Sequence, residues 1–257
     1  MSTDLMRPEL VVAAAVLGAI VGSFLGAALE RLPNGRSIVT GRSACDHCGT
    51  TLTVQELVPI LSWAAQRGRC RTCGGAIGGW QLACELGGAG IGAASLAFAG
   101  EGLAISAMAL GWQLLLLALL DLRHLWLPRA LTILLAANGL LLAAARTWVE
   151  QSSDPLVMAL IGGLVGWSML ALVAALYRRA RGREGMGGGD PPLLGAIGLW
   201  VGPVGVVHVV LGAAIVGLVA AIAMHLSGRK IAADTALPLG TCLAATAWPI
   251  FLLTGAG

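Results

Sequence analysis

Two aspartates, Asp121 and Asp190, each stand where a long apolar stretch meets a polar loop. An ionisable residue at a membrane is costly, so each aspartate is a candidate functional residue. Because they belong to different apolar stretches, the fold could bring them together. Two carboxylates at close range share one proton, so that one activates water while the other polarises a peptide carbonyl. On the residues alone, a helix-end charge at Asp121 and a helix cap at Asp190 are equally good interpretations.

Three glycines, Gly187, Gly188 and Gly189, directly precede Asp190. Glycine permits positive φ angles and lets another backbone approach closely. Such a run would therefore permit positive φ. We also expect close contact there with an extended substrate or a neighbouring helix.

Four of the six cysteines form two Cys-x2-Cys pairs, each followed by glycine. The pairs can present four thiolates as a tetrahedron, which suits structural zinc, and a reducing cytoplasm disfavours disulfides. Such a closed site leaves no coordination position for catalysis, so zinc would stabilise the segment. A redox dithiol pair and four free thiols are the alternatives. The proposed zinc ligands are Cys45, Cys48, Cys70 and Cys73.

The elements that position these residues are membrane helices. Only 11% of the residues are charged and 57% are hydrophobic, against about 25% charged residues in soluble domains. Each bilayer span needs about 20 apolar residues. One apolar stretch is long enough for two spans divided near residues 202–205, which gives eight helices. The apolar stretches are 10–29, 86–100, 102–120, 130–145, 155–177, 191–228 and 235–257, and the second must borrow residues 81–85 to cross the bilayer.

The basic residues indicate how the chain crosses the membrane. With eight spans and the N-terminus outside, all of the sixteen Lys and Arg residues except Arg7 and Arg146 fall on the cytoplasmic side. The net charge of +3 therefore reflects topology, and we predict no nucleic-acid partner. Glycines spaced four residues apart predict close helix packing. They are Gly18, Gly22 and Gly26, Gly88 and Gly92, and Gly162 and Gly166.

The chain is expected to have three parts. Residues 1–29 form a first transmembrane helix, which lacks the features of a cleaved signal peptide. Residues 30–80 form a cytoplasmic segment that holds the four-cysteine cluster. Residues 81–257 form a seven-helix membrane domain that contains both aspartates.

The chain resembles the type IV prepilin peptidase family over nearly its whole length. The first helix and its exit match in Gly-Ser-Phe-Leu at 22–25 and Glu-Arg-Leu-Pro at 30–33, and the two cysteine pairs follow. Asp121 with Leu127-Pro128 resembles the first aspartate motif. The stretch 185–190 with Leu193-Leu194 resembles the second, of the GxGD type. Leu-Pro-Leu-Gly at 237–240 resembles the start of the last helix.

The resemblance implies an intramembrane aspartic endopeptidase of the bacterial inner membrane. Family members remove the basic leader of type IV prepilins and pseudopilins at the cytoplasmic face. Asp121 and Asp190 would be the catalytic pair, with Gly187, Gly188, Gly189 and Pro128 supporting the loops around substrate. Members with the cysteine segment often also methylate the new N-terminus with S-adenosylmethionine.

Three departures from the family pattern stand out: Arg129 after Leu-Pro, Pro191-Pro192 after the second aspartate, and Gly26 in place of an asparagine. Two other functional classes stay open. A membrane scaffold with a zinc segment would not depend on either aspartate. A small transporter would carry ions, although its acidic residues would be expected nearer the membrane midplane.

Overall fold

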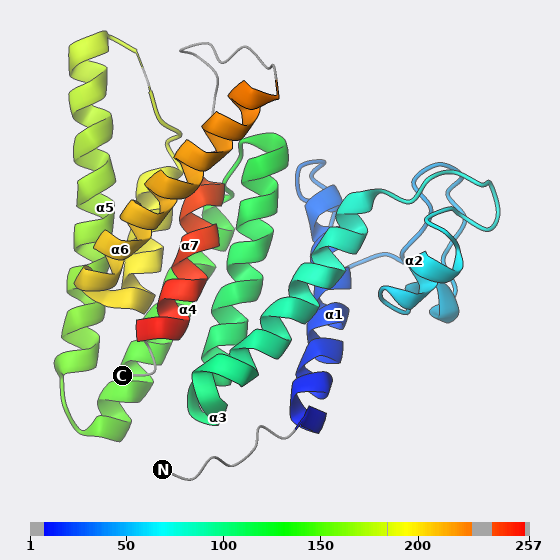
Figure 1. Ribbon diagram of the computed structural model, residues 1–257, viewed down its shortest axis with the longest axis horizontal. Helices are drawn as coiled ribbons and strands as arrows, with labels where there is room; N and C mark the ends of the chain where they lie inside the picture. The colour runs from blue at the N-terminus through cyan, green and yellow to red at the C-terminus, as the bar shows by residue number, and fades with distance from the viewer. Residues whose placement is uncertain (1–7, 184, 228–237, 255–257) are drawn as a thin grey trace. The chain divides into compact units, whose positions relative to one another are not determined.

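The computed structural model describes residues 8–183, 185–227 and 238–254, and in these ranges every regular element is helical. Figure 1 shows the elements in order. They are α1 (Pro8–Arg31), η1 (Val54–Leu57), α2 (Leu61–Ala65), α3 (Gly79–His124), α4 (Arg129–Glu150), α5 (Asp154–Arg181), α6 (Asp190–Leu226) and α7 (Leu239–Thr254). The chain forms two compact units, Met1–Leu116 and Leu117–Gly257.

In the first unit, α3 doubles back on itself, as Figure 1 shows. Its two arms are Gly79–Ala99 and Gly102–His124. The indole N–H of Trp112 on the second arm donates to the carbonyl of Gly88 on the first arm, at 3.1 Å. Ala14 of α1 shares a buried cluster with Ala104 and Met108 of the second arm. The predicted boundary between two spans near residue 100 therefore lies inside one helical element.

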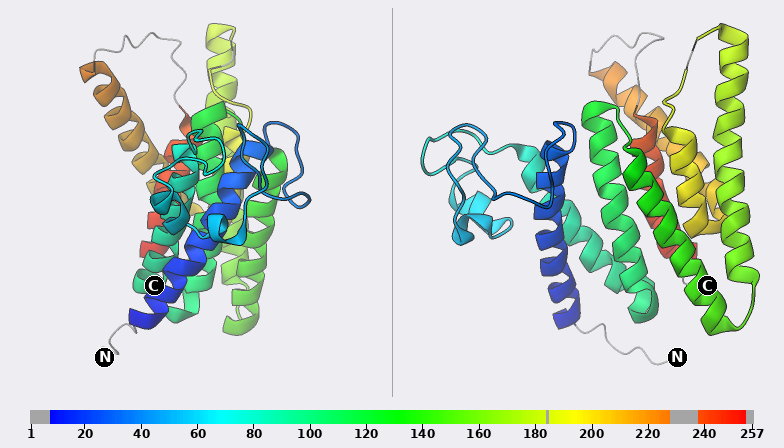
Figure 2. Two further views of the ribbon diagram at one scale, coloured as in Figure 1. Left: turned by 90° about the vertical axis from the view of Figure 1, so that its right-hand side faces the viewer. Right: turned by 180° about the vertical axis from the view of Figure 1, so that it is seen from behind.

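In the second unit, α4, α5 and α7 pack around α6, which changes direction sharply at Gly202. Gly202 has φ 67° and ψ 179°, a conformation that favours glycine, and Pro203 follows it. The right-hand view in Figure 2 shows the two arms of α6 running in different directions. At the bend, the Trp200 indole donates to Leu135 of α4 at 2.9 Å and meets Phe251 of α7 edge-on.

The predicted close helix packing at spaced glycines is confirmed. A Cβ on Gly18 would collide with the backbone at Gly88, and one on Gly162 would collide with the backbone at Gly198. These contacts join α1 to α3 and α5 to α6. The same holds on the neighbouring turns, where Gly22 meets Cys84, Gly92 meets Ala14 and Gly166 meets Leu194. The absence of side chains therefore lets the helix backbones touch.

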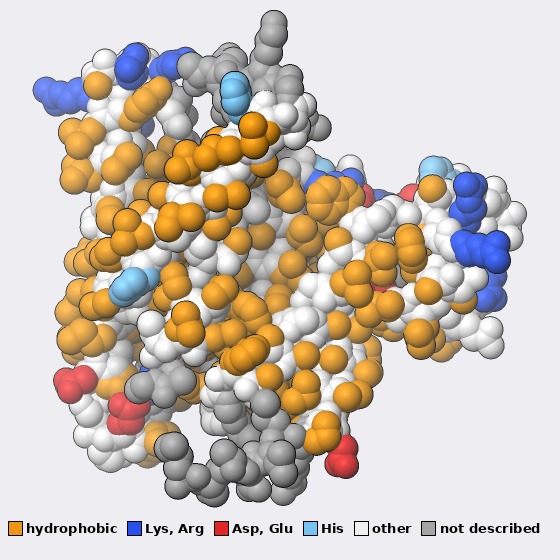
Figure 3. Space-filling model, in the orientation of Figure 1, with side chains coloured by type: hydrophobic (Ala, Val, Ile, Leu, Met, Phe, Trp, Pro, Cys, Tyr) orange, Lys and Arg blue, Asp and Glu red, His pale blue; other side chains and the backbone are white. Residues whose placement is uncertain are grey.

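The prediction of an all-helical, multi-pass membrane protein is confirmed. In the described ranges, six helical segments are long and apolar enough to cross a membrane. The bend divides the last of them, α6, and α7 adds a shorter apolar helix of 16 residues, so a helical segment stands at each of the eight predicted spans. Figure 3 shows hydrophobic side chains over the outer faces of α5 and α6, with basic residues at the end of α5. Arg7, Arg229, Lys230 and Leu237 lie outside the described residues.

Candidate active site and metal centre

Asp121 lies in the last turns of α3 and is 5% exposed. Its carboxylate faces the beginning of α7, where the backbone N–H of Thr241 donates to Oδ2 at 2.7 Å. The first N–H groups of a helix have no acceptor within the helix, so they are available to a carboxylate from elsewhere. Asp121 is therefore a buried acid held against a helix start, unlike a solvated charge at a helix end.

Asp190 is the first residue of α6 and is also 5% exposed. Gly189 occupies the cap position, so the interpretation of Asp190 as the helix cap is wrong. The two aspartates lie close enough for the charge of Asp121 to act on Asp190. The structure thus brings together, within the second unit, two acids that are far apart in the sequence.

A tight turn after α3 places an apolar side chain beside both acids. Leu125 adopts φ 47° and donates its N–H to the carbonyl of Asp121 at 2.8 Å. The side chain of Leu127 then lies against Gly189, which precedes Asp190, and against Gly240, which precedes Thr241. Pro128 is buried and caps α4, where its carbonyl accepts the N–H groups of Leu131 and Thr132.

The glycines before Asp190 matter because a side chain at two of them would collide with a neighbouring residue. None of Gly187, Gly188 and Gly189 has the positive φ that such a run permits. A Cβ on Gly189 would lie 2.9 Å from the Cβ of Leu127, and one on Gly187 would lie 3.1 Å from Oδ2 of Asp190. A Cβ on Gly188 would meet open space.

We expect Gly189→Ala to reduce the activity of the site by at least about tenfold, because the new methyl must displace Leu127 at its anchored Cβ. Gly188→Ala is the matched control, one residue away, and should leave activity within about twofold of wild type. Initial rates at equal amounts of folded membrane protein would test the pair. Equal rates for the two variants would contradict this account of Gly189.

The four predicted metal ligands form one cluster in the first unit. The Sγ atoms of Cys45, Cys48, Cys70 and Cys73 all lie within 4.8 Å of one another. The two halves have matching turns: the N–H of Gly49 donates to the carbonyl of Cys45, and that of Gly74 to the carbonyl of Cys70, at 2.8 and 2.9 Å. Zinc–sulfur bonds of about 2.3 Å need sulfur atoms at this kind of separation. The donor set therefore fits a tetrahedral metal ion.

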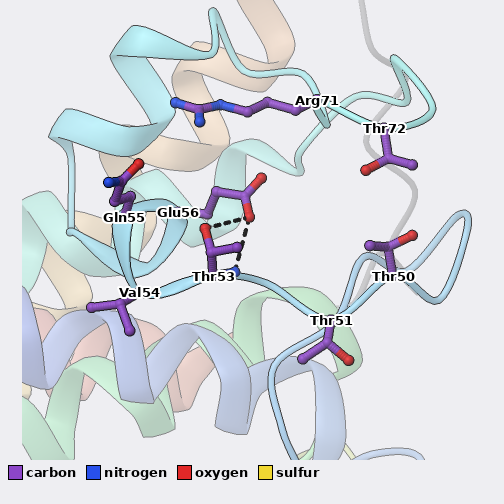
Figure 4. Close-up of a pocket in the computed structure, with 8 residues that line it drawn as sticks. All are labelled: Thr50, Thr51, Thr53, Val54, Gln55, Glu56, Arg71 and Thr72. Atoms are coloured by element: carbon purple, nitrogen blue, oxygen red, sulfur yellow. Dashed lines mark hydrogen bonds between the residues drawn. The ribbon is translucent and has the colours of Figure 1, made fainter.

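A pocket of about 580 Å³ lies beside the cysteine cluster. Two of the residues that line it, Thr53 and Glu56, are joined by hydrogen bonds that stabilise this segment. In Figure 4, Glu56 reaches back to Thr53, whose N–H and hydroxyl donate to its carboxylate at 2.9 and 2.8 Å. These bonds, the one from the Thr53 backbone first, lower the pKa of Glu56. Glu56 is therefore engaged as the partner of a capping box.

Glu85 is a functional candidate whose role the sequence did not reveal. It lies in α3, is 5% exposed, and accepts the N–H of Ile60 at 2.7 Å and the side-chain amide of Gln81 at 3.0 Å. Ile60 has φ 63° and ψ −52°, which is rare and strained for a β-branched residue. Glu85 thus fastens a strained loop residue to α3.

We expect Glu85→Ala to lower the free energy of unfolding of the first unit by about 1–3 kcal/mol, because a buried N–H would lose its acceptor. Glu85→Gln keeps a carbonyl oxygen and should recover part of that loss. Thermal unfolding in detergent, followed by the fluorescence of the loop tryptophan Trp63, would measure both variants. Identical midpoints for wild type and Glu85→Ala would refute this role.

Protein-family models match segments of both compact units. Residues 16–98 match the bacterial peptidase A24 N-terminal domain, and residues 108–222 match the type IV leader peptidase family. The chain belongs to the type IV leader peptidase family. This confirms the resemblance found in the sequence motifs.

Relatives extend the match along most of the chain. A prepilin leader peptidase/N-methyltransferase from Burkholderia pseudomallei strain 1026b is 35% identical, over 90% of this chain and 82% of the relative. A type 4 prepilin-like proteins leader peptide-processing enzyme from Escherichia coli O78:H11 is 34% identical, over 90% of each. A prepilin leader peptidase/N-methyltransferase from Dickeya chrysanthemi is 34% identical, over 80% of this chain and 79% of the relative. No solved structure is significantly similar to the chain.

The structure shows where each of the three departures from the leader peptidase family pattern lies. Pro191 and Pro192 stand in the first turn of α6, where the missing N–H groups cost nothing. Gly26 packs against the side chain of Gln81, so a longer side chain there would have to displace that glutamine. Arg129 is exposed at the beginning of α4.

Proposed function

We propose that this protein is an aspartic endopeptidase that removes the leader of type IV prepilins or pseudopilins at the cytoplasmic face of the bacterial inner membrane. The observation that carries the proposal is the buried approach of Asp121 and Asp190, within a chain of the leader peptidase family. The lipid bilayer would hold the enzyme and the apolar part of its substrate together.

In the proposed reaction, the ionised carboxylate takes a proton from water, and the resulting hydroxide adds to the carbonyl carbon of the scissile bond. The protonated carboxyl group gives its proton to the carbonyl oxygen at the same time. The tetrahedral intermediate then collapses: the C–N bond breaks, the leaving nitrogen takes the proton from the first carboxyl group, and the second recovers its own. Burial of both acids excludes bulk water and strengthens the electrostatic interactions in this sequence.

We also propose that Cys45, Cys48, Cys70 and Cys73 hold a structural zinc ion. Their four Sγ atoms all lie within 4.8 Å of one another, which is the donor arrangement that a tetrahedral zinc site requires. Zinc would supply folding energy to the segment between α1 and α3 and would take no part in hydrolysis.

N-terminal methylation is the second activity we propose, by analogy with the names of the relatives. The first unit holds a cavity of about 790 Å³ beside the end of α1, lined among others by Glu30, Asp46 and Trp63. Its size suits a small-molecule cofactor. Arg31, Arg36 and Arg42 also line it, so the cavity offers acids for a cationic sulfur and amine and arginines for a carboxylate. These residues would hold S-adenosylmethionine, which supplies an activated methyl group.

The test is leader cleavage in membranes that contain a prepilin and either wild type or the double variant Asp121→Asn/Asp190→Asn. We expect mature pilin with wild type and only the precursor with the double variant, by mass spectrometry. Asp154→Asn alters an exposed acid and serves as the control, with full activity expected. Equal cleavage by the double variant would exclude the aspartic mechanism. No cleavage by folded wild type of several prepilins would favour the membrane scaffold.

A further inference from the structure

The two carboxylates of the proposed pair have unequal hydrogen-bond donors. Oδ2 of Asp121 accepts the Thr241 N–H at 2.7 Å, and the Thr241 hydroxyl lies 3.2 Å from the same oxygen. The backbone of Gly240 lies close to this carboxylate, since a Cβ on Gly240 would be 3.0 Å from the same oxygen. Among the described residues, Asp190 has one hydrogen-bond partner, the backbone of Gly187. The beginning of α7 therefore surrounds one acid of the pair with donors and not the other.

We propose that Thr241 is a positioning residue that keeps Asp121 as the ionised member of the pair, so that Asp190 holds the shared proton. This inference rests on the proposed function and assigns the two roles that the proposal left open. An oxygen that accepts an N–H group cannot itself be protonated toward that group, so Oδ2 stays an acceptor. A helix N-terminus also favours negative charge. Oδ1 of Asp121 is then the oxygen that takes the proton of water.

The Thr241 hydroxyl can follow the charge of Asp121 during turnover. Its single hydrogen has two acceptors within reach, Oδ2 of Asp121 at 3.2 Å and the carbonyl of Ala118 at 2.9 Å. When Asp121 is ionised, the hydrogen can turn to Oδ2, where a charge-assisted bond is stronger. After Oδ1 has taken a proton from water, the hydrogen can return to Ala118. No group has to move except the hydroxyl hydrogen.

Among the described residues, Thr241 is the main group that influences the protonation of Asp121. The titratable groups that face it are Asp190 at the beginning of α6 and the buried thiol of Cys242 on α7. From the turn between α3 and α4 it meets the apolar Leu127 through Gly240. No basic side chain forms an ion pair with either aspartate in the part of the chain that the structure describes.

The test is the pH profile of kcat for leader cleavage by purified enzyme, with wild type, Thr241→Val and Thr241→Ser. Removal of the hydroxyl in Thr241→Val should allow Asp121 to be protonated more easily. The acidic limb should then move upward by about one pH unit, and kcat on that limb should fall about tenfold. Thr241→Ser keeps both donors and should reproduce the wild-type profile.

Thr246→Val is the matched control for a merely structural loss. Thr246 lies on the same helix and its hydroxyl contacts the carbonyl of Val209 on α6 at 3.1 Å, away from the aspartates. It should lower the thermal midpoint and leave the acidic limb in place. An unmoved limb in folded Thr241→Val would overturn the inference while wild-type cleavage upholds the function. Equal limb shifts in Thr241→Val and Thr246→Val would also overturn it. If folded wild-type enzyme cleaves no leader, the proposed function itself is refuted instead.

Discussion

Asp121→Asn alone, or Asp190→Asn alone, should reduce leader cleavage by roughly 10²- to 10⁴-fold, and the double variant should be hardly worse than either. Both acids are needed in one step, because water must lose a proton while the peptide carbonyl gains one. Losses from residues that act as a unit are not additive. Asparagine keeps the size of the side chain and its carbonyl oxygen, so the Thr241 N–H retains an acceptor. Single-turnover rates of the three variants would test this expectation.

Additive losses would show that the two acids act independently. The thermal midpoint of each variant provides the necessary control, since an unfolded protein would also be inactive. Full activity in either single variant would remove that residue from the catalytic pair.

The fold was largely predictable because lipid imposes a simple rule on sequence. Long uncharged stretches must be helices, since lipid offers no partner for backbone N–H and C=O groups. The close packing at Gly18 and Gly162 followed from their spacing. The division of residues 191–228 near Gly202 also followed, because the stretch was too long for one span. The pattern did not show that both arms of α3 form one continuous helical element.

The candidate site was predictable in its acids but not in their surroundings. Asp121 and Asp190 stand out because charged residues are rare in this chain. Thr241 does not, because a threonine in an apolar stretch gives no sign that its backbone N–H and its hydroxyl both face a carboxylate. Only the matching motif at 237–240, one residue before Thr241, pointed to this region. The glycines before Asp190 permit both positive φ and close packing, and sequence alone cannot separate the two.

Removal of one metal ligand, as in Cys48→Ser, should abolish zinc binding and unfold the segment between α1 and α3. The four sulfur atoms lie within 4.8 Å of one another, and thiolates held so close repel unless a cation joins them. Structural zinc contributes about 10–16 kcal/mol in small zinc-binding peptides at neutral pH, more than the whole stability of many small domains. Metal analysis should give one zinc per wild-type chain and none in the variant, and limited proteolysis should cut the variant between residues 32 and 78.

Cys84→Ala is the matched control, because Cys84 is fully buried in α3 and lies outside the cluster. It should retain one zinc per chain and resist proteolysis in the loop. Zinc lost equally from both variants would mean that the metal is not bound by the predicted ligands. A loop that stays protease-resistant without metal would mean that hydrogen bonds such as Glu85 to Ile60 suffice to order it. Because hydrolysis is assigned to Asp121 and Asp190, chelation should abolish the fold of the segment without changing the chemistry required of the two acids.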